Sequence, residues 1–517
     1  MQTRWFYRLS ILYLTLPFLL FLFGWVRLTI AIPLAFIILF TLYKLLFINY
    51  QLPTFHWSLN TVYWLLTIAL WLLLSGIGGY AFQNWDHNWR NVVFRDLMNF
   101  NWPVYYAQPE SGPVKMLVYY VGFWLPSALI AKVTNWQVAN FALFIWSFAG
   151  LLLVTHRLAS ALKTSNLKAT LLLIFFSGLD VLGTLFFAKD YPTLLPPITH
   201  LETWAGNLQY SSFTTQLFWV FNQAIPAWLC ITLIVTLSDS AASPKGEGSL
   251  PLSKETLRSA QSDTRSELIL LWSLCFFFAP LAAVGLLPYI IIELIKQTDF
   301  KSPFKHLNPA IVLSALIIFL LSAFFFTTNT AAQSRGFQSL PLGKFLAFFL
   351  LEGGLLWLVL APSKYKDPRW IVTGILLLLI PFIQLGSDRD FVMRASIAPL
   401  FYLMLLTGET IFNKSTPRLL LVPVYCLLIL GSLTPLYEIN RSIYRTFDYY
   451  FIQQDCGCEF AADPIIHIVH PDVPEKEHPG SITADALPTL QFLATELSQN
   501  FIANVRQTFF YKYLAKR

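Results

Sequence analysis

The sequence predicts an all-α membrane protein, a polytopic bundle of about 11–13 membrane segments. The first reason is composition, because 56% of the 517 residues are hydrophobic and only 12% are charged. The second is that apolar runs of roughly 17–20 residues recur along the chain, each long enough to cross a bilayer as a helix. A helix also satisfies its own backbone polar groups where water is absent. These features exclude a soluble enzyme with a single core.

The charged residues are few and spread over the loops. The net charge of +7 fits the excess of basic residues in cytoplasmic loops, and it is not gathered into a stripe that would bind nucleic acid. Membrane lipids are therefore the expected partners. Arg4 and Arg8 predict a cytoplasmic N-terminus, and Leu9–Trp25 lacks a small-residue cleavage site, so we expect a retained anchor rather than a signal peptide.

The first half of the chain contains six expected spans. In order they are Leu9–Trp25, Leu28–Leu46, Leu59–Gly76, Val138–Val154, Ala169–Phe187 and Leu217–Leu237. Met116–Trp136 is also apolar, but Pro126 and Lys132 interrupt it, and the basic segment that begins at Arg157 should be cytoplasmic. We therefore expect Met116–Trp136 to be re-entrant or interfacial.

The second half contains five more expected spans and one broken segment. The spans are Ala310–Phe326, Leu342–Ala361, Trp370–Leu385, Ala395–Ile411 and Leu419–Leu433. The broken segment is Leu268–Ile295, which contains Pro280, Gly285 and Pro288 and has basic residues at both ends. It predicts two short helices that enter and leave on one side.

These spans predict one transmembrane domain over residues 1–435 and a small extracytoplasmic C-terminal region over 436–517. The loops 79–113 and 188–214 should lie on the outer face. Residues 238–266 contain Ser, Pro and Lys without a hydrophobic period, which predicts a flexible cytoplasmic linker.

The first outer loop gathers charge at one membrane surface. Its segment from Trp85 to Pro103 carries two carboxylates, Asp86 and Asp96, with Arg90 between them. Their spacing predicts a loop that runs into a short interfacial helix. A solvated loop with an aromatic belt would explain the same composition. A second charged cluster, which runs from Asp388 to Arg394, is expected on the same side and favours a functional role.

Three further ionisable residues are candidates for the same site. Asp180 lies inside an expected span, where a charge is costly and indicates either a functional site or a helix-packing contact. His200 and Glu202 lie in the second outer loop. Together with Asp86 and Asp96, they predict a carboxylate-rich pocket for a divalent cation, Mg²⁺ or Mn²⁺, or for a general base that deprotonates an acceptor hydroxyl.

Arginines supply the positive side of this expected site. Arg394 and Arg389 predict a bidentate grip on a lipid phosphate. Asp390, Arg90 and His200 are expected to complete this phosphate-binding set. The alternative is a surface ion-pair turn, which would contribute little.

These motifs resemble those of the GT-C superfamily of membrane glycosyltransferases, and more closely those of bacterial membrane proteins of that type. The resemblance is carried by Asp86, Asn91, Asp96–Leu97, Ser177–Asp180, His200–Trp204, Gln209–Ser212 and Asp390–Ser396. It extends from the third span to about Ser396 and leaves the tail uncovered. Two positions depart from the pattern, since His87 stands where Trp is usual and Arg90 where His is usual. The loop also follows the third span rather than the first.

The resemblance implies that a sugar is taken from a polyprenyl-phosphate donor and transferred to an acceptor on the extracytoplasmic face, in a bacterial inner membrane. Asp86 would be the base that activates the acceptor, or a metal ligand. Asp96, Asp180 and Glu202 would support it or complete a metal site. Arg394 with Arg389 would hold the carrier phosphate.

Two other functions remain open at the level of sequence. A transporter or flippase for a lipid-linked or anionic solute would use the same charges near the membrane midplane. An assembly subunit without chemistry of its own would leave Asp86 and Arg394 far apart. The arrangement of these residues in space distinguishes the three.

Overall fold

The computed structural model describes residues 2–47, 58–188, 197, 200–242, 254–298, 307–329, 335–386, 390–448 and 500–517. Ten helices in these ranges are long and apolar enough to cross a membrane. Helices of that length and composition define an integral, multi-pass membrane protein built as an all-α bundle. The predicted fold class is confirmed at this level.

The first half of the chain follows the expected order of spans. Its helices are α1 (Gln2–Trp25), α2 (Leu28–Phe47), α3 (Leu59–Leu74), α4 (Trp85–Asn99), η1 (Val121–Trp124), α5 (Leu125–Ala131), α6 (Trp136–Ala161), α7 (Asn166–Phe175), α8 (Asp180–Phe187), η2 (Leu201–Thr203) and α9 (Phe213–Ala242). The span expected over Ala169–Phe187 is broken between α7 and α8. Met116–Trp136 contains short elements and no helix long enough to span, in keeping with a re-entrant or interfacial segment.

The second half holds the remaining helices. They are α10 (Lys254–Phe278), α11 (Pro280–Gln297), α12 (Pro309–Phe326), α13 (Leu342–Phe349), η3 (Leu350–Gly354), α14 (Leu355–Lys364), α15 (Pro368–Leu379), η4 (Ile380–Phe382), α16 (Asp390–Ala395), α17 (Ile397–Phe412), α18 (Arg418–Gly431), α19 (Leu433–Phe447) and η7 (Phe510–Leu514). The boundary expected between residues 435 and 436 falls inside α19.

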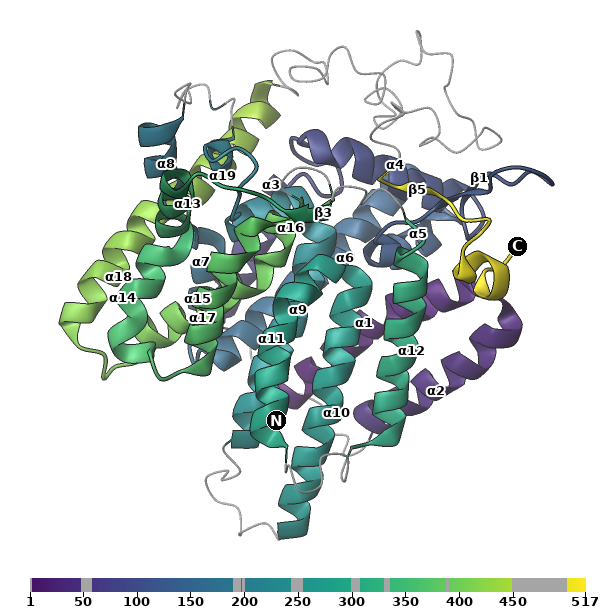
Figure 1. Ribbon diagram of the computed structural model, residues 1–517, viewed down its shortest axis with the longest axis horizontal. Helices are drawn as coiled ribbons and strands as arrows, with labels where there is room; N and C mark the ends of the chain where they lie inside the picture. The colour runs from purple at the N-terminus through teal and green to yellow at the C-terminus, as the bar shows by residue number, and fades with distance from the viewer. Residues whose placement is uncertain are drawn as a thin grey trace.

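Two expectations for the middle of the chain are corrected. The linker expected over 238–266 is largely helical, because α9 continues to Ala242 and α10 begins at Lys254. The rest of that linker, 243–253, lies outside the described residues. The broken segment after it forms two long helices rather than two short ones. They meet at Ala279 and lie side by side next to α12 (Figure 1).

The centre of the bundle is built on α9 and α17. Helix α9 packs against α6, α10 and α17. The most apolar stretch of Asp390–Phe412 is buried throughout, and that of Phe213–Asp239 nearly so. Because burial of apolar surface dominates the stability of such contacts, the ends of these two core helices are well fixed. Those ends carry the residues of interest.

The loop over 79–113, which the sequence predicts to be the first outer loop, folds together with the strands that follow it. After α4, strands β1 (Tyr105–Ala107) and β2 (Lys115–Leu117) pair antiparallel, and β5 (Ile502–Asn504) pairs with the other edge of β2. A second sheet joins β3 (Arg335–Phe337) to β4 (Ile383–Leu385).

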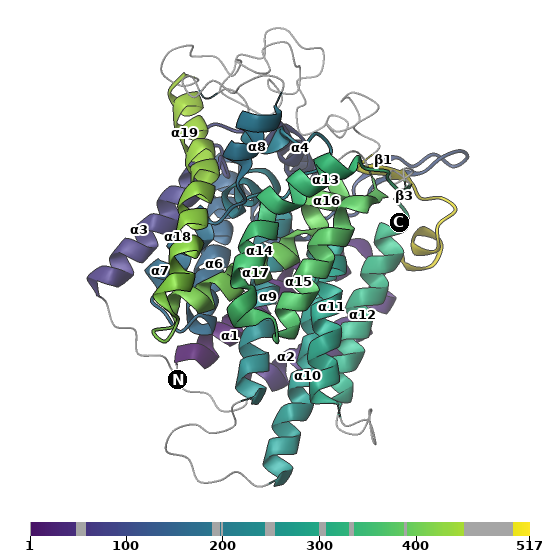
Figure 2. The same cartoon turned by 60° about the vertical axis from the view of Figure 1, so that its left-hand side comes forward.

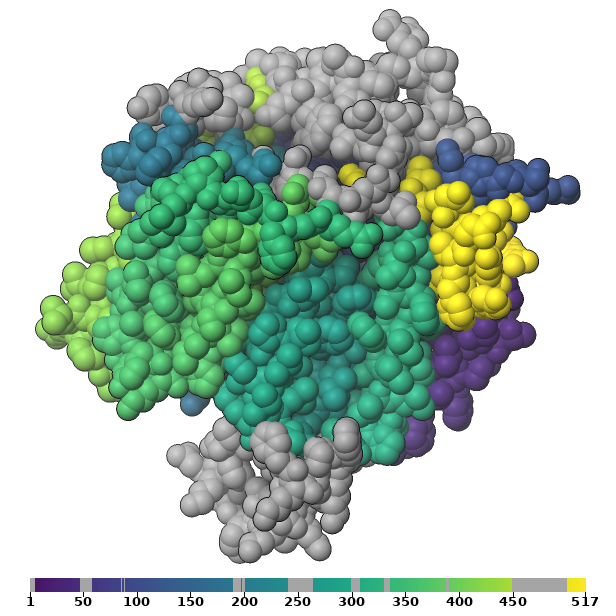
Figure 3. Space-filling model, in the orientation of Figure 1, coloured from purple at the N-terminus to yellow at the C-terminus, as the bar shows by residue number. Residues whose placement is uncertain are grey.

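The end of the chain returns to the first helical hairpin. Arg27, which follows α1, donates hydrogen bonds to the carbonyls of Lys512 at 2.7 Å and Ala515 at 3.1 Å. The yellow C-terminal segment accordingly packs beside the purple N-terminal helices (Figure 3). Residues 500–517 therefore lie with the first outer loop. Figures 1 and 2 both place α4, α8, α16 and α19 at this end of the bundle, which we call the loop end.

Candidate functional site

The first turn of α4, which carries Asp86, is anchored to a kink in α9. The backbone of Val220 leaves the helical region there, with φ −132° and ψ 36°. The carbonyl of Phe218 accepts hydrogen bonds from Asn84 Nδ2 at 2.8 Å and from the His87 ring at 2.9 Å. Asn84 Oδ1 in turn caps the helix by accepting from the Asp86 N–H.

His87 is a neutral part of this anchor. Burial and the nearby charge of Arg90 lower the pKa of His87 to about 4. The imidazole is therefore uncharged at neutral pH, and its Nε2–H donates to the Phe218 carbonyl because that oxygen only accepts.

Asp86 and Arg90 form an ion pair one helical turn apart. The Nη2–Oδ2 distance is 2.9 Å, and the side chains are 32% and 4% exposed, respectively. Arg90 Nε also donates to Asn222 Oδ1 at 3.4 Å, and the guanidinium lies over the Phe221 ring. Its Nη1 is buried and has no hydrogen-bond partner among the described residues. The pair thus combines a fixed cation with a carboxylate that reaches the surface.

Asp390 and Arg394 repeat this arrangement on α16. Their Nη1–Oδ1 distance is 2.7 Å, with the Arg394 side chain 10% and the Asp390 side chain 33% exposed. Within the part of the chain that the structure describes, Arg394 Nε is also buried without a hydrogen-bond partner. Helix α16 packs closely on α11 at Gly285. This close approach requires glycine, because a Cβ there would collide with the Ala395 carbonyl. Arg389 lies outside the described residues.

The charges of both ion pairs act on Tyr119, a buried residue between β2 and η1. Burial raises the pKa of the Tyr119 hydroxyl, the charges of Arg90 and Arg394 oppose that rise, and the carboxylates of both pairs add to it. Charges from α4 and α16 therefore act on one buried hydroxyl. We call these five residues the ion-pair cluster. It brings together the two charged segments that the sequence singled out.

A second group of ionisable side chains begins at the break between α7 and α8. Asp180 is 1% exposed and accepts a hydrogen bond from Ser177 Oγ at 3.1 Å. The carbonyls of Ser177 and Gly178 in the break pack on Gly431 of α18, where any Cβ would crowd them. A helix broken at membrane depth is tolerated only where protein surrounds it, and here α18 provides that cover.

Glu352 faces this break from the one-turn π-helix η3. It is 2% exposed, and Oε1 accepts from Trp204 Nε1 at 2.8 Å. Its other oxygen lies against Gly178, where a Cβ would collide with it. Glycine at 183 similarly leaves room for the Trp204 ring. The glycines on either side of Asp180 thus permit these close approaches.

Glu202 is buried among hydrogen-bond donors. Oε1 accepts from the Ser212 N–H at 3.0 Å and from Thr215 Oγ1 at 2.6 Å, and Oε2 accepts from Gln209 Nε2 at 3.0 Å. Burial raises the pKa of Glu202 to about 7, and the negative charge of Asp180 acts in the same direction.

His200 joins Glu202 to α19. Its Nδ1 lies 3.2 Å from Glu438 Oε2 and its Nε2 lies 3.7 Å from Glu202 Oε2. Burial alone would lower the pKa of His200, but the charges of Glu438 and Glu202 outweigh burial and raise it. Glu438 also accepts from Trp219 Nε1 at 2.8 Å and pairs with Arg441 at 3.3 Å. We call Asp180, Glu352, Glu202, His200 and Glu438 the carboxyl cluster.

The two clusters are neighbours at the α9 kink. Phe218 binds the first turn of α4 through its carbonyl, and the next residue, Trp219, donates to Glu438 and stacks on His200. Both clusters therefore lie at the loop end, but their residues form two separate hydrogen-bonded groups.

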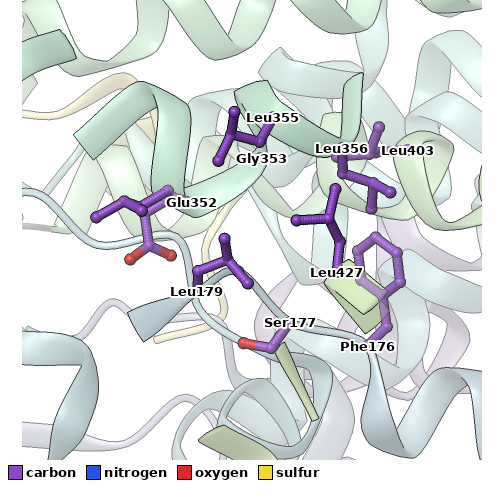
Figure 4. Close-up of a pocket in the computed structure, with 11 residues that line it drawn as sticks. Phe176, Ser177, Leu179, Glu352, Gly353, Leu355, Leu356, Leu403 and Leu427 are labelled. Carbon is purple, nitrogen blue, oxygen red and sulfur yellow. The ribbon is translucent and has the colours of Figure 1, made fainter. Parts of the chain in front are cut away.

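A small, mostly apolar cavity adjoins the carboxyl cluster. Leucines from α14, α17 and α18 line it together with the backbone of the α7–α8 break. In Figure 4 the Glu352 carboxyl turns away from these leucines toward the chain at Leu179. The cavity therefore leaves space beside the α7–α8 break, while the Glu352 carboxyl stays buried.

The carboxyl cluster does not fit a divalent cation. Both oxygens of Glu202 are occupied by hydrogen-bond donors, and Mg²⁺ or Mn²⁺ would need those lone pairs. No three His, Cys, Asp or Glu residues within the described ranges are placed to hold a metal ion.

Four predicted site residues occupy other places. Asp96 is fully buried and accepts from Tyr106 at 3.0 Å, so it ties α4 to β1 rather than reaching the surface. His200 belongs to the carboxyl cluster and not to the phosphate-binding arginines. Asp180 and Glu202 likewise lie with Glu438 and not with Asp86.

Four important residues were missed by sequence reasoning. Tyr119 has no sequence signal, because its role depends on two distant segments that meet. Glu352 is a glutamate followed by two glycines within an apolar run, and this unusual pattern is the signal that could have found it. Glu438 and Arg441 fell in a tail assigned to a separate region, where their i, i+3 spacing would have indicated a helix.

Fold and site together define a multi-pass membrane protein with two polar clusters at one end of its bundle. A comparison of the chain with known protein families, curated proteins and solved structures finds no match.

Proposed function

We propose that this protein is a membrane glycosyltransferase that takes a sugar from a polyprenyl-phosphate donor and transfers it to an acceptor at the loop end of the bundle. The observation that carries the proposal is the convergence of Asp86–Arg90 and Asp390–Arg394 on Tyr119. Two guanidinium groups with free N–H groups suit a phosphate. A lipid phosphate meets protein at the edge of the membrane, where these helices end.

The residues suit the individual steps of such a transfer. Asp86 is partly exposed and takes the proton from the acceptor hydroxyl as its oxygen forms a bond to the anomeric carbon. The bond from that carbon to the carrier phosphate breaks, and the phosphate leaves with the electron pair. Arg90 and Arg394 stabilise the charge that develops on the phosphate, and their burial strengthens this effect.

A transporter for an anionic or lipid-linked solute is the second candidate. One observation favours it, which is that the α7–α8 span is discontinuous and has a buried carboxyl at the break. The ion-pair cluster favours the transferase. A transporter needs its charged residues near the midplane of the membrane, whereas Asp86 and Asp390 reach the surface at one end of the bundle.

The proposal is tested with purified protein in lipid vesicles and a panel of polyprenyl-phosphate hexoses and pentoses. Asp86→Asn should abolish transfer while leaving polyprenyl-phosphate binding intact, because it removes the base and keeps the shape. Arg394→Gln should weaken that binding about tenfold, as expected for the loss of one charge-assisted hydrogen bond. The matched control is Glu293→Gln, which alters an ion pair on α11 away from both clusters.

Transfer that persists at the wild-type rate in Asp86→Asn would contradict the assignment of the base. Movement of the lipid-linked sugar across the vesicle without transfer would support the transporter instead.

A further inference from the structure

Two buried carboxyls that the proposed reaction does not use face each other inside the bundle. Asp180 is 1% and Glu352 is 2% exposed, and they come from α8 and from the π-turn η3. The segments that carry them are in direct contact, because the Leu179 N–H donates to the Leu351 carbonyl at 2.8 Å and Glu352 Oε2 lies against Gly178. Each carboxyl acts on the other as a hydrogen-bond partner. Ionisable groups in membrane-spanning segments are costly, and their presence indicates a function.

The hydrogen-bond donors around this pair are too few for two charges. Asp180 accepts from Ser177, and Glu352 Oε1 accepts from Trp204. Glu352 Oε2 is buried and receives no hydrogen bond from any N–H or O–H group of the described residues. Two ionised carboxylates in contact would repel strongly at low dielectric. One proton between them replaces that repulsion with a short O–H···O⁻ bond.

The other charged groups near the pair do not neutralise it. Glu202, on η2, adds a further negative charge that acts on Glu352. His200 acts on Asp180 but is already bonded to Glu438 of α19, which also pairs with Arg441.

Of the remaining elements around the pair, α19 places the buried hydroxyl of Thr434 beside Asp180. The others present groups that bond elsewhere or are apolar. Tyr210, at the start of α9, approaches Glu352 but donates its hydrogen bond to the Leu377 carbonyl. Helix α18 contributes Leu427 and Gly431 at the break.

We propose that Asp180 and Glu352 form a proton-binding site in which the two carboxyls share one proton, which exchanges with the loop end through Glu202 and His200. The pair carries one negative charge with the proton bound and two after its release. Glu202 lies next to the pair, and its Oε2 is 3.7 Å from His200 Nε2. The His200 side chain is 12% exposed, so the route ends near solvent. This site is independent of the ion-pair cluster and of sugar transfer.

Infrared spectroscopy of the protein in vesicles at neutral pH tests the proposal. A protonated carboxyl has a C=O stretching band that an ionised carboxylate lacks. Because Glu202 is itself partly protonated near neutral pH, the comparison is made with Glu202→Gln present in every protein. The Glu202→Gln protein should show this band, and adding Asp180→Asn or Glu352→Gln should remove it. In each variant the new amide donates an N–H to the remaining carboxylate and so takes the place of the proton. Adding Glu293→Gln should leave the band unchanged.

A band that is equally strong in the Glu202→Gln protein and in both of its double variants would overturn the proposal. So would a band that sodium chloride removes from the Glu202→Gln protein and potassium chloride does not, because the pair would then bind Na⁺.

A second measurement needs no variant. The apparent melting temperature of the wild type should fall as rising pH removes the shared proton, and added Na⁺ should not restore it. A melting temperature that sodium restores would likewise assign the pair to Na⁺.

Discussion

At the scale of single residues, both clusters work by placing charge in buried surroundings. Arg90 and Arg394 are buried, and the carboxylate that each one pairs with reaches the edge of solvent. The carboxyl cluster instead buries its four carboxyls and leaves only His200 partly exposed. Position in the fold therefore assigns different chemistry to residues that look alike in the sequence.

Glu202 gives a prediction for stability against pH. Burial raises its pKa from 4.5 to about 7, so between these values the folded protein holds a proton that the unfolded chain has lost. Stability therefore falls as pH rises through this window and levels off above it. In Glu202→Gln the apparent melting temperature should fall less across this window than in the wild type, by about 3 °C or more. Melting curves in detergent measure it, and a slope equal to that of the wild type would argue against a protonated Glu202.

At the scale of elements, irregular backbone positions the functional groups. The kink at Val220 frees the Phe218 carbonyl for α4, the break between α7 and α8 makes room for Asp180, and the π-turn η3 presents Glu352. Such breaks are costly in lipid, and π-turns are frequent at functional sites. Their concentration around the two clusters is what links this fold to a function.

The contact between α11 and α16 gives a prediction at this scale. Gly285→Ala would push its new Cβ into the Ala395 carbonyl, next to Arg394. We expect a loss of about 1–3 kcal/mol in stability, because overpacking forces the helices apart, and weaker binding of polyprenyl phosphate as Arg394 moves.

Gly343→Ala on α13 is the control for this substitution. Nothing lies within 4 Å of a Cβ there, so stability should stay the same or rise slightly. Thermal melting and lipid-phosphate binding measure both variants. Equal effects of the two substitutions would show that the α11–α16 contact does not position Arg394.

At the scale of the whole molecule, the chain brings distant segments to one end. Residues 500–517 add a strand to the first outer loop and bond to Arg27, while Arg506 donates to the Glu110 carbonyl at 3.0 Å. At the other end of α17, Glu409 pairs with Lys364 and Arg369 in the basic turn between α14 and α15. The positive-inside rule predicts that this turn is cytoplasmic.

Cysteine labelling tests this arrangement. In a protein without its natural cysteines, Glu110→Cys and Arg517→Cys should both react with a membrane-impermeant maleimide from the outer side. Lys366→Cys, in the basic turn, should react only after the membrane is opened. Labelling of positions 110 and 517 from opposite sides would contradict the shared loop end.

The sequence predicts most spans, because apolar length alone decides whether a helix crosses lipid. It also predicts that the segments of Asp86 and Arg394 lie at the same end of the bundle (Figures 1 and 2), because that follows from the order of the spans. That these residues form one site stays a prediction. It does not predict Tyr119 or the pairing of Asp180 with Glu352, because these depend on contacts between elements far apart in the chain. The helix over 254–266 was missed because this polar part of α10 has no apolar periodicity. It is helical as the continuation of the apolar part of α10 that follows it.

The central claim is that a lipid phosphate binds between the two ion pairs. A cryo-electron microscopy structure of the protein with a polyprenyl phosphate tests it most directly. We predict density for the phosphate within hydrogen-bonding distance of Arg90 Nη1 and Arg394 Nε, with the polyprenyl chain extending into the lipid. A phosphate bound elsewhere, with both arginines unchanged, would contradict the account.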